Sequence, residues 1–155
     1  MSSKFIKNNQ LKDKNKKLIS NSKIFDSFKK TKRFSMKWES YFNVYEKIFE
    51  KFRGKKITFV EVGVSAGGSL EMWRDFFGEN ARIVGIDLNP EAKILEQDGF
   101  EIFVGNQSDP EFWKKFYSEI GKIDVLLDDG GHKNIQQINT VHNSIENIND
   151  GGLIV

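Results

Sequence analysis

The chain of 155 residues has no cysteine, only two prolines and only two histidines. The absence of cysteine excludes disulfides, thiolate zinc sites and cysteine nucleophiles, and it agrees with a reducing, cytoplasmic location. No apolar run approaches the roughly 20 residues of a membrane-spanning helix, so we expect no membrane span. The basic N-terminus lacks the apolar stretch of a secretory signal. We therefore expect a cytoplasmic globular protein, and the length suits one domain.

Charge is distributed unevenly along the chain. Residues 1–37 hold 12 lysines and arginines against two aspartates, a net charge of +10, whereas residues 38–155 carry a net charge of −8. Such a basic segment either contacts a polyanion such as nucleic acid or is a solvated leader. The scarcity of aromatic residues among its lysines favours the leader. We expect a basic, partly disordered arm over residues 1–37 and a folded domain over residues 38–155.

Segments with helical and strand patterns alternate along the folded domain. Aromatic and aliphatic residues at three- and four-residue spacing predict helices, and short runs rich in β-branched residues predict strands. A short helix is also expected within residues 22–34. Strands are predicted at residues 57–64, 82–87, 100–104, 123–127 and 152–155, and helices at residues 38–52, 69–77, 91–97, 109–120 and 133–148.

This alternation, with connections of a few residues, predicts an α/β fold. The expected form is a doubly wound, Rossmann-like parallel sheet of five strands in the order 3-2-1-4-5. Because the chain stops inside an apolar strand, we expect it to be truncated after the fifth strand. Ligands of such sheets bind beyond the carboxyl ends of the strands, and polar residues follow each strand of this chain.

The first strand leads into a glycine-rich turn. Glu61-Val62-Gly63 is followed by Ser65 and Gly67, a spacing that differs from the G-x-G-x-x-G of dinucleotide-binding proteins. The Glu61 carboxylate would repel a pyrophosphate but would suit a ligand with an ammonium group. These features disfavour a nicotinamide-dependent oxidoreductase, and an ordinary strand–helix turn stays open as the alternative.

The second and third strands end in further polar residues. Asp87 could accept hydrogen bonds from ribose hydroxyls, and Asn106 or Gln107 could contact an adenine edge. Each also has an ordinary structural explanation, because such residues commonly cap the next helix. Asp109, which precedes Pro110, is predicted to be a helix cap only.

The fourth strand ends in Asp128-Asp129-Gly130-Gly131-His132. Carboxylate oxygens suit a hard cation such as Mg²⁺, and a histidine beside them could act as a general base. The alternative is a turn with an aspartate cap and an exposed histidine. The convergence of four polar strand ends favours the functional interpretation.

Together these motifs resemble the class I S-adenosylmethionine-dependent methyltransferases over residues 38–155. The Asp-Asp-Gly-x-His form is similar to the metal-dependent sugar O-methyltransferases of macrolide pathways and to cephalosporin hydroxylase-like proteins. The resemblance is carried by Glu61-Val62-Gly63 with Gly67-Gly68-Ser69, by Val84-Gly85-Ile86-Asp87, by Gly105-Asn106-Gln107, and by Ile123 through His132.

The resemblance implies a role for each position. Asp129 would be a magnesium ligand, and His132 would be the base that deprotonates a hydroxyl acceptor, which makes these two the expected catalytic residues. Glu61 and the following turn would hold the methionine end of the cofactor, and Asp87 would bind its ribose. The residues expected to bind S-adenosylmethionine are Glu61, Gly63, Ser65, Gly67, Asp87, Leu88, Asn106, Gln107 and Asp128.

Two departures from the family pattern matter. Asn106 stands where the family usually has aspartate, and the chain ends at Val155, before the Glu-Asp pair that completes the family's metal site. The implied function is O-methylation of a sugar or glycan hydroxyl, assisted by magnesium. Two alternatives stay open: a truncated, non-catalytic nucleotide-binding module, and a nucleic-acid methyltransferase recruited through the basic arm. A homo-oligomer that covers the open strand edge also stays open.

Overall fold

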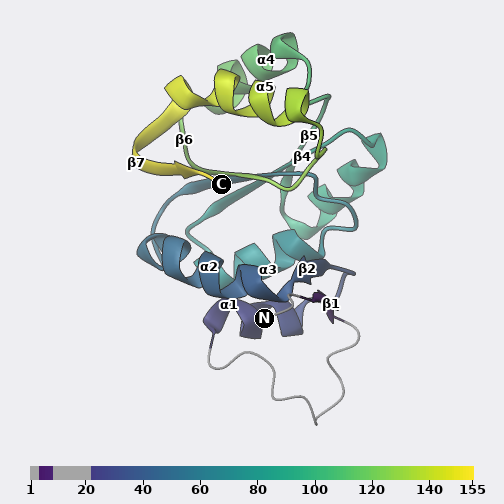
Figure 1. Ribbon diagram of the computed structural model, residues 1–155, viewed down its shortest axis with the longest axis vertical. Coiled ribbons are helices and arrows are strands. Elements are labelled where there is room, and N and C mark those ends of the chain that lie inside the picture. The colour runs from purple at the N-terminus through teal and green to yellow at the C-terminus, as the bar shows by residue number, and fades with distance from the viewer. Residues whose placement is uncertain (1–3, 9–21) are drawn as a thin grey trace. The chain divides into compact units, whose positions relative to one another are not determined.

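The structure is a computed structural model that describes residues 4–8 and 22–155. Predictions for residues 1–3 and 9–21 lie outside this part of the chain. The chain divides into two compact units (Figure 1). The helical unit holds the described residues up to Lys55 together with Ala66–Asn80, and the sheet unit holds Lys56–Ser65 together with Ala81–Val155. Within the described residues, none of the helices has the length and apolar character needed to span a membrane.

The sheet unit is built on five parallel strands. Their order is β5-β4-β3-β6-β7, which confirms the predicted order and the doubly wound fold class. The central strand β3 pairs with both β4 and β6, so the sheet reverses its strand order there. The strands are β3 (Thr58–Val62), β4 (Arg82–Asp87), β5 (Glu101–Val104), β6 (Ile123–Asp128) and β7 (Ile148–Ile154).

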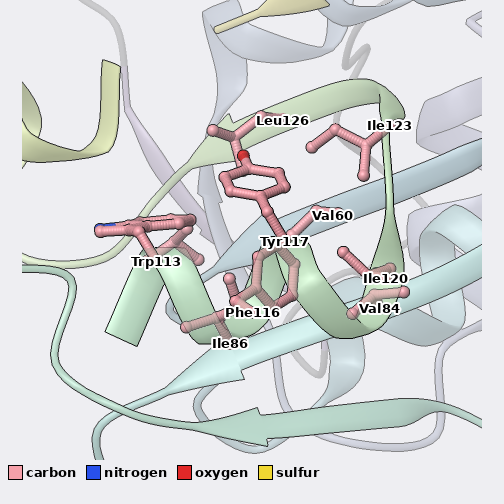
Figure 2. Packing of buried hydrophobic residues seen from close by; sticks show 10 residues of the cluster. Val60, Val84, Ile86, Trp113, Phe116, Tyr117, Ile120, Ile123 and Leu126 are labelled. Carbon is pink, nitrogen blue, oxygen red and sulfur yellow. The ribbon is translucent and has the colours of Figure 1, made fainter. Parts of the chain in front are cut away.

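Helix α4 (Pro110–Ile120) covers one face of this sheet. It begins as predicted, because the Asp109 carboxylate accepts a hydrogen bond from the Glu111 amide and Pro110 occupies the first turn. Figure 2 shows its aromatic side chains packed against aliphatic residues of β3, β4 and β6. This cluster contains Val60, Val62, Val84, Ile86, Trp113, Phe116, Tyr117, Ile120, Ile123 and Leu126.

Helix α5 (Asn134–Ser144) lies on the same side of the sheet as α4 (Figure 1). The 3-10 helix η4 (Ile145–Asn147) follows it, and β7 then begins at Ile148. The expectation that the helix extends to residue 148 is therefore wrong, and the fifth strand starts four residues before Gly152. Between β4 and β5 the predicted short helix is the 3-10 helix η3 (Pro90–Asp98).

The predicted apolar side of α5 forms, but it faces solvent. Ile138 is 61% exposed and Ile145 of η4 is 63% exposed, whereas Thr140 and Ser144 are fully buried. The hydrophobic spacing identified the helix correctly but did not identify which side packs on the protein.

The helical unit contains three α-helices and a two-stranded antiparallel sheet in its described part. The predicted helix over residues 38–52 is confirmed as α2 and η2, and the short helix within residues 22–34 is α1. The elements are β1 (Phe5–Lys7), α1 (Lys23–Lys30), β2 (Met36–Trp38), α2 (Glu39–Phe49), η2 (Glu50–Phe52) and α3 (Gly68–Phe77).

Aromatic side chains form the core of the helical unit. Phe28, Phe42, Phe49 and Trp73 are fully buried, and their rings meet in tilted and edge-on pairs. The edge-on arrangement suits the quadrupoles of aromatic rings.

Several basic residues of the predicted arm are engaged within the helical unit. Lys23 pairs with Glu50 at 2.6 Å, and Lys30 pairs with Asp75 at 2.9 Å. Nucleic acid would have to compete with these carboxylates. The division of the chain at residue 37 itself stays a prediction.

Candidate functional site

The carboxyl ends of β3, β4, β5 and β6 surround a hollow of about 420 Å³ in the sheet unit. Parallel strands bring their carboxyl ends to one edge, so residues far apart in the sequence meet here. Of the residues predicted to bind the cofactor or metal, the hollow is lined by Gly63, Ser65, Asp87, Leu88, Asn106, Gln107 and Asp129.

Gly63 brings the turns after β3 and β6 together. Its φ of +84° lies in the left-handed region, and an added Cβ would collide with the Asp129 carbonyl oxygen and lie 2.6 Å from the Gly130 Cα. The turns are also joined by a hydrogen bond from the Asp129 amide to the Val62 carbonyl oxygen, at 3.0 Å. A glycine is therefore required by both conformation and close approach.

The Asp87 carboxylate anchors the turn after β3. Its Oδ2 accepts hydrogen bonds from the Val64 and Ser65 amides at 3.0 and 3.1 Å, and its Oδ1 accepts one from the Asn89 amide at 2.9 Å. A carboxylate offers about four acceptor positions, so one remains for a ligand hydroxyl. Ser65 has a φ of +48°, a strained conformation for a residue with a side chain.

The two amide residues after β5 differ in their environment. Asn106 is exposed, and its Oδ1 accepts a hydrogen bond from the Ser108 amide at 2.9 Å. Gln107 is only 6% exposed, and its side chain contacts Asp128, Gly131 and Thr140. Asn106 is thus the one with an amide that solvent or a ligand can reach.

Asp128, the last residue of β6, stabilises the turn that follows it. Asp128 Oδ1 accepts a hydrogen bond from the Gly130 amide at 3.1 Å, and Asp129 lines the hollow. His132 is exposed and is not among the residues that line the hollow. In residues 4–8 and 22–155, the structure contains no group of three or more histidine, aspartate or glutamate residues that could hold a metal ion.

Three predicted cofactor residues, Glu61, Gly67 and Asp128, are not among the residues that line the hollow. The Asp128 carboxylate instead accepts hydrogen bonds from the Gly130 amide and from Gln107 Nε2. Glu61 is fully buried in β3, between Val60 and Val62, whose side chains pack under α4. Strand alternation therefore directs Glu61 to the opposite face of the sheet. Gly67 belongs to the helical unit, where it is the left-handed residue before α3.

Sequence reasoning did not assign Ile86 and Gln136 to the site, although both line the hollow. Gln136 follows His132 by four residues and lies in the first turn of a predicted helix. Helical side chains lean toward the N-terminus of their helix, so this position could have been found. Ile86 is the penultimate residue of β4, and a buried strand pattern does not distinguish lining residues from core residues.

Comparison with known proteins identifies relatives of this chain, although no family model matches it. It is 32% identical over 130 residues to the 8-demethyl-8-alpha-L-rhamnosyl tetracenomycin-C 2'-O-methyltransferase of Streptomyces olivaceus, a match over 78% of this chain and 34% of the relative. It is 30% identical over 118 residues to the demethylmacrocin O-methyltransferase of Streptomyces fradiae, covering 72% of this chain and 29% of that protein. This chain is a homologue of sugar O-methyltransferases.

A solved structure also matches this chain. The MycE methyltransferase of the mycinamycin biosynthetic pathway, in complex with Mg and SAH, matches with a TM-score of 0.68 and 27% identity. The match covers 74% of this chain and 33% of MycE. The expected resemblance is confirmed, and the chain has the class I S-adenosylmethionine-dependent methyltransferase fold. It spans about a third of the length of the curated relatives that it matches.

Proposed function

We propose that the hollow of the sheet unit binds S-adenosylmethionine and that the chain is part of an O-methyltransferase for a sugar or glycan hydroxyl. The observation that carries the proposal is the hollow itself, which places Asp87 and the Gly63 turn at neighbouring strand ends of a methyltransferase fold. The relative from Streptomyces olivaceus named above acts on a rhamnosyl derivative of tetracenomycin C, and this supports the choice of acceptor.

The residues of the hollow suit this cofactor. The Gly63 turn allows the backbone to approach a ligand closely, and the remaining acceptor position of Asp87 can receive a ribose hydroxyl. The exposed amide of Asn106 can contact an adenine edge. When bound, S-adenosylmethionine would supply a methyl group carried on a positively charged sulfur, and the carboxylates of Asp87 and Asp129 give the hollow a complementary charge.

The protein's main tasks would be to position the acceptor and to receive its proton. Transfer of a methyl group to a hydroxyl releases one proton, and His132 is the proposed base because imidazole accepts a proton near neutral pH. Holding the acceptor oxygen in line with the donor would supply much of the rate enhancement.

Magnesium is supported by the MycE complexes, which contain it. The described residues of this chain supply the Asp129 carboxylate at the hollow, but they form no cluster of three potential ligands. This donor set does not fit a magnesium site by itself, so the metal stays a prediction and no step of the proposed reaction depends on it.

Isothermal titration calorimetry with S-adenosylhomocysteine tests the cofactor, with NAD as the control ligand and with and without Mg²⁺. We expect S-adenosylhomocysteine to bind and NAD not to bind. Asp87→Asn should weaken binding by about tenfold or more, because it removes a charged acceptor from both the ribose and the turn. Glu91→Gln, a change at an exposed residue of η3, should leave the affinity for S-adenosylhomocysteine unchanged.

Absence of binding in the wild-type chain would contradict the cofactor proposal and favour the non-catalytic module. Binding of both ligands with similar affinity would indicate a general nucleotide site.

A further inference from the structure

Gln107 is buried between three elements of the sheet unit. It follows β5, it is 6% exposed, and its side chain lies between the turn after β6 and helix α5. Its backbone carbonyl oxygen accepts a hydrogen bond from the Trp113 indole at 2.9 Å, which fixes it to helix α4.

Every polar atom of the Gln107 side chain is engaged within the protein. Nε2 donates to both carboxylate oxygens of Asp128 at 3.1 Å and to Thr140 Oγ1 at 3.0 Å. Oε1 accepts a hydrogen bond from the Gly131 amide at 2.6 Å. Thr140 donates its own hydroxyl proton to the Gln136 carbonyl oxygen, so its lone pair is available to Nε2.

These partners fix the orientation of the amide. A carboxylate accepts but does not donate hydrogen bonds, so Nε2 must face Asp128 and Oε1 must face the Gly131 N–H. An added Cβ on Gly130 would collide with Oε1, which shows that the turn passes directly over the amide. Gln107 therefore contacts the turn on both sides of Asp129.

We propose that Gln107 is a positioning residue, which holds the turn from Asp128 to His132 so that Asp129 faces the hollow. This replaces the expectation that the Gln107 amide contacts the adenine, because both ends of that amide are engaged by Asp128, Thr140 and Gly131. The inference rests on the proposed function for the roles of Asp129 and His132 in acceptor chemistry. The hydrogen bonds by which Gln107 holds the turn, which we call the Gln107 clamp, do not depend on that function.

The side chain at position 107 must supply two hydrogen-bond donors and one acceptor, and it must be long enough to place them at Asp128, Thr140 and Gly131. Methionine has a similar length but forms none of these hydrogen bonds. Glutamate keeps an acceptor for the Gly131 amide but sets a second carboxylate against Asp128, where like charges repel. The two substitutions therefore loosen the turn by different routes.

Amide hydrogen exchange of the full chain, measured by NMR without ligand, tests the clamp. In Gln107→Met we expect the Gly131 amide to exchange at least about tenfold faster than in the wild type, because its acceptor is lost. The Gly99 and Gly121 amides, which donate to the Glu96 and Tyr117 carbonyl oxygens, should keep their rates. A general loss of stability would instead accelerate all three.

Thr140→Val is the matched control. It removes the link to α5 but leaves the bonds of Gln107 to Asp128 and Gly131, so the Gly131 amide should stay protected. If Gln107→Met fails to fold, Gln107→Glu gives a second test, in which repulsion between its carboxylate and that of Asp128 should displace the turn and speed exchange of the Gly131 amide. Unchanged exchange of Gly131 in a folded variant would overturn the inference.

Calorimetry separates positioning from adenine recognition. We expect Gln107→Met to weaken S-adenosylhomocysteine binding only together with faster exchange of the Gly131 amide, because any loss of affinity would come from the loosened turn. A loss of affinity of tenfold or more with unchanged Gly131 exchange would return Gln107 to the adenine site and overturn the inference. Failure of the wild-type chain to bind S-adenosylhomocysteine would contradict the proposed function only, because the exchange experiment needs no ligand.

Discussion

At the scale of single residues, Gly63 controls the approach of the two turns that border the hollow. Gly99 offers a matched comparison in the same unit, because its φ is +82° against +84° for Gly63, and an added Cβ there meets nothing within 4 Å. The two glycines share a positive φ and differ in their surroundings. Substitution by alanine at both positions therefore separates backbone strain from collision.

We expect Gly99→Ala to lower the free energy of unfolding by about 1 kcal/mol, the cost of a left-handed alanine. Gly63→Ala should cost at least about 2 kcal/mol more, because the Asp129 carbonyl oxygen must move. It should also weaken S-adenosylhomocysteine binding, while Gly99→Ala should not. Urea unfolding and calorimetry measure both effects, and equal losses at the two sites would show that the turns are not in contact.

Position along a strand was enough to predict which residues meet at the hollow, whereas the roles assigned to them stay predictions. Gly63, Asp87 and Asp129 lie at the carboxyl ends of strands, and parallel strands bring these ends to one hollow. The partners of Gln107 could not be predicted in this way. Its hydrogen bonds depend on where α5 lies and on the path of the turn after β6, and neither is encoded in local spacing.

At the scale of elements, the contact between α4 and α5 contains a buried phenol. Burial raises the pKa of Tyr117 to about 12, from an ordinary value of 10.0. The hydroxyls of Tyr117 and neighbouring Ser144 are both buried, and the interaction with Ser144 lowers the pKa of Tyr117 by less than burial raises it. The folded state therefore favours the neutral phenol, which resists ionisation more than it does in the unfolded chain.

This difference makes stability depend on alkaline pH. The contribution of Tyr117 to the free energy of unfolding is fully present below about pH 10 and is lost as the pH rises toward 12. In that range the phenol ionises readily in the unfolded chain but not in the folded one. By pH 11 the loss should reach about 1 kcal/mol. Tyr117→Phe should remove this alkaline loss of stability. Near neutral pH the free energy of unfolding of the variant should differ from that of the wild type by less than about 1 kcal/mol.

Urea unfolding at pH 8 and pH 11 measures this effect. Tyr41→Phe is the control, because Tyr41 is 39% exposed. If Tyr117→Phe and the wild type lose stability equally at pH 11, the phenol is not protected by burial.

Helix α5 shows what an amphipathic pattern can and cannot reveal. The spacing of its aliphatic residues predicted a helix, and the structure confirms one. The packed side, however, carries Gln136, Thr140 and Ser144, and the Thr140 hydroxyl is needed as an acceptor for Gln107. Periodicity indicates that a helix has two unlike faces, but only the tertiary partners decide which face is buried.

At the scale of the whole molecule, the outward side of α5 and η4 is an exposed apolar stripe. We define the stripe by Ile135, Ile138, Val141 and Ile145, all between 44% and 63% exposed. In the isolated chain of 155 residues these four side chains are in contact with water. Aligned aliphatic side chains of this kind favour association with another surface.

We expect the isolated chain to self-associate through the stripe, because burying it removes apolar area from water. Sedimentation velocity over a range of protein concentrations should show a concentration-dependent increase in the average sedimentation coefficient. The double variant Ile138→Gln/Ile145→Gln should shift association to at least about tenfold higher concentration, which corresponds to about 1.4 kcal/mol. Ile94→Gln, at an isoleucine of η3 that is 50% exposed, should leave the association unchanged. A wild-type chain that stays monomeric at all concentrations, or a double variant that associates as before, would show that the stripe does not drive assembly.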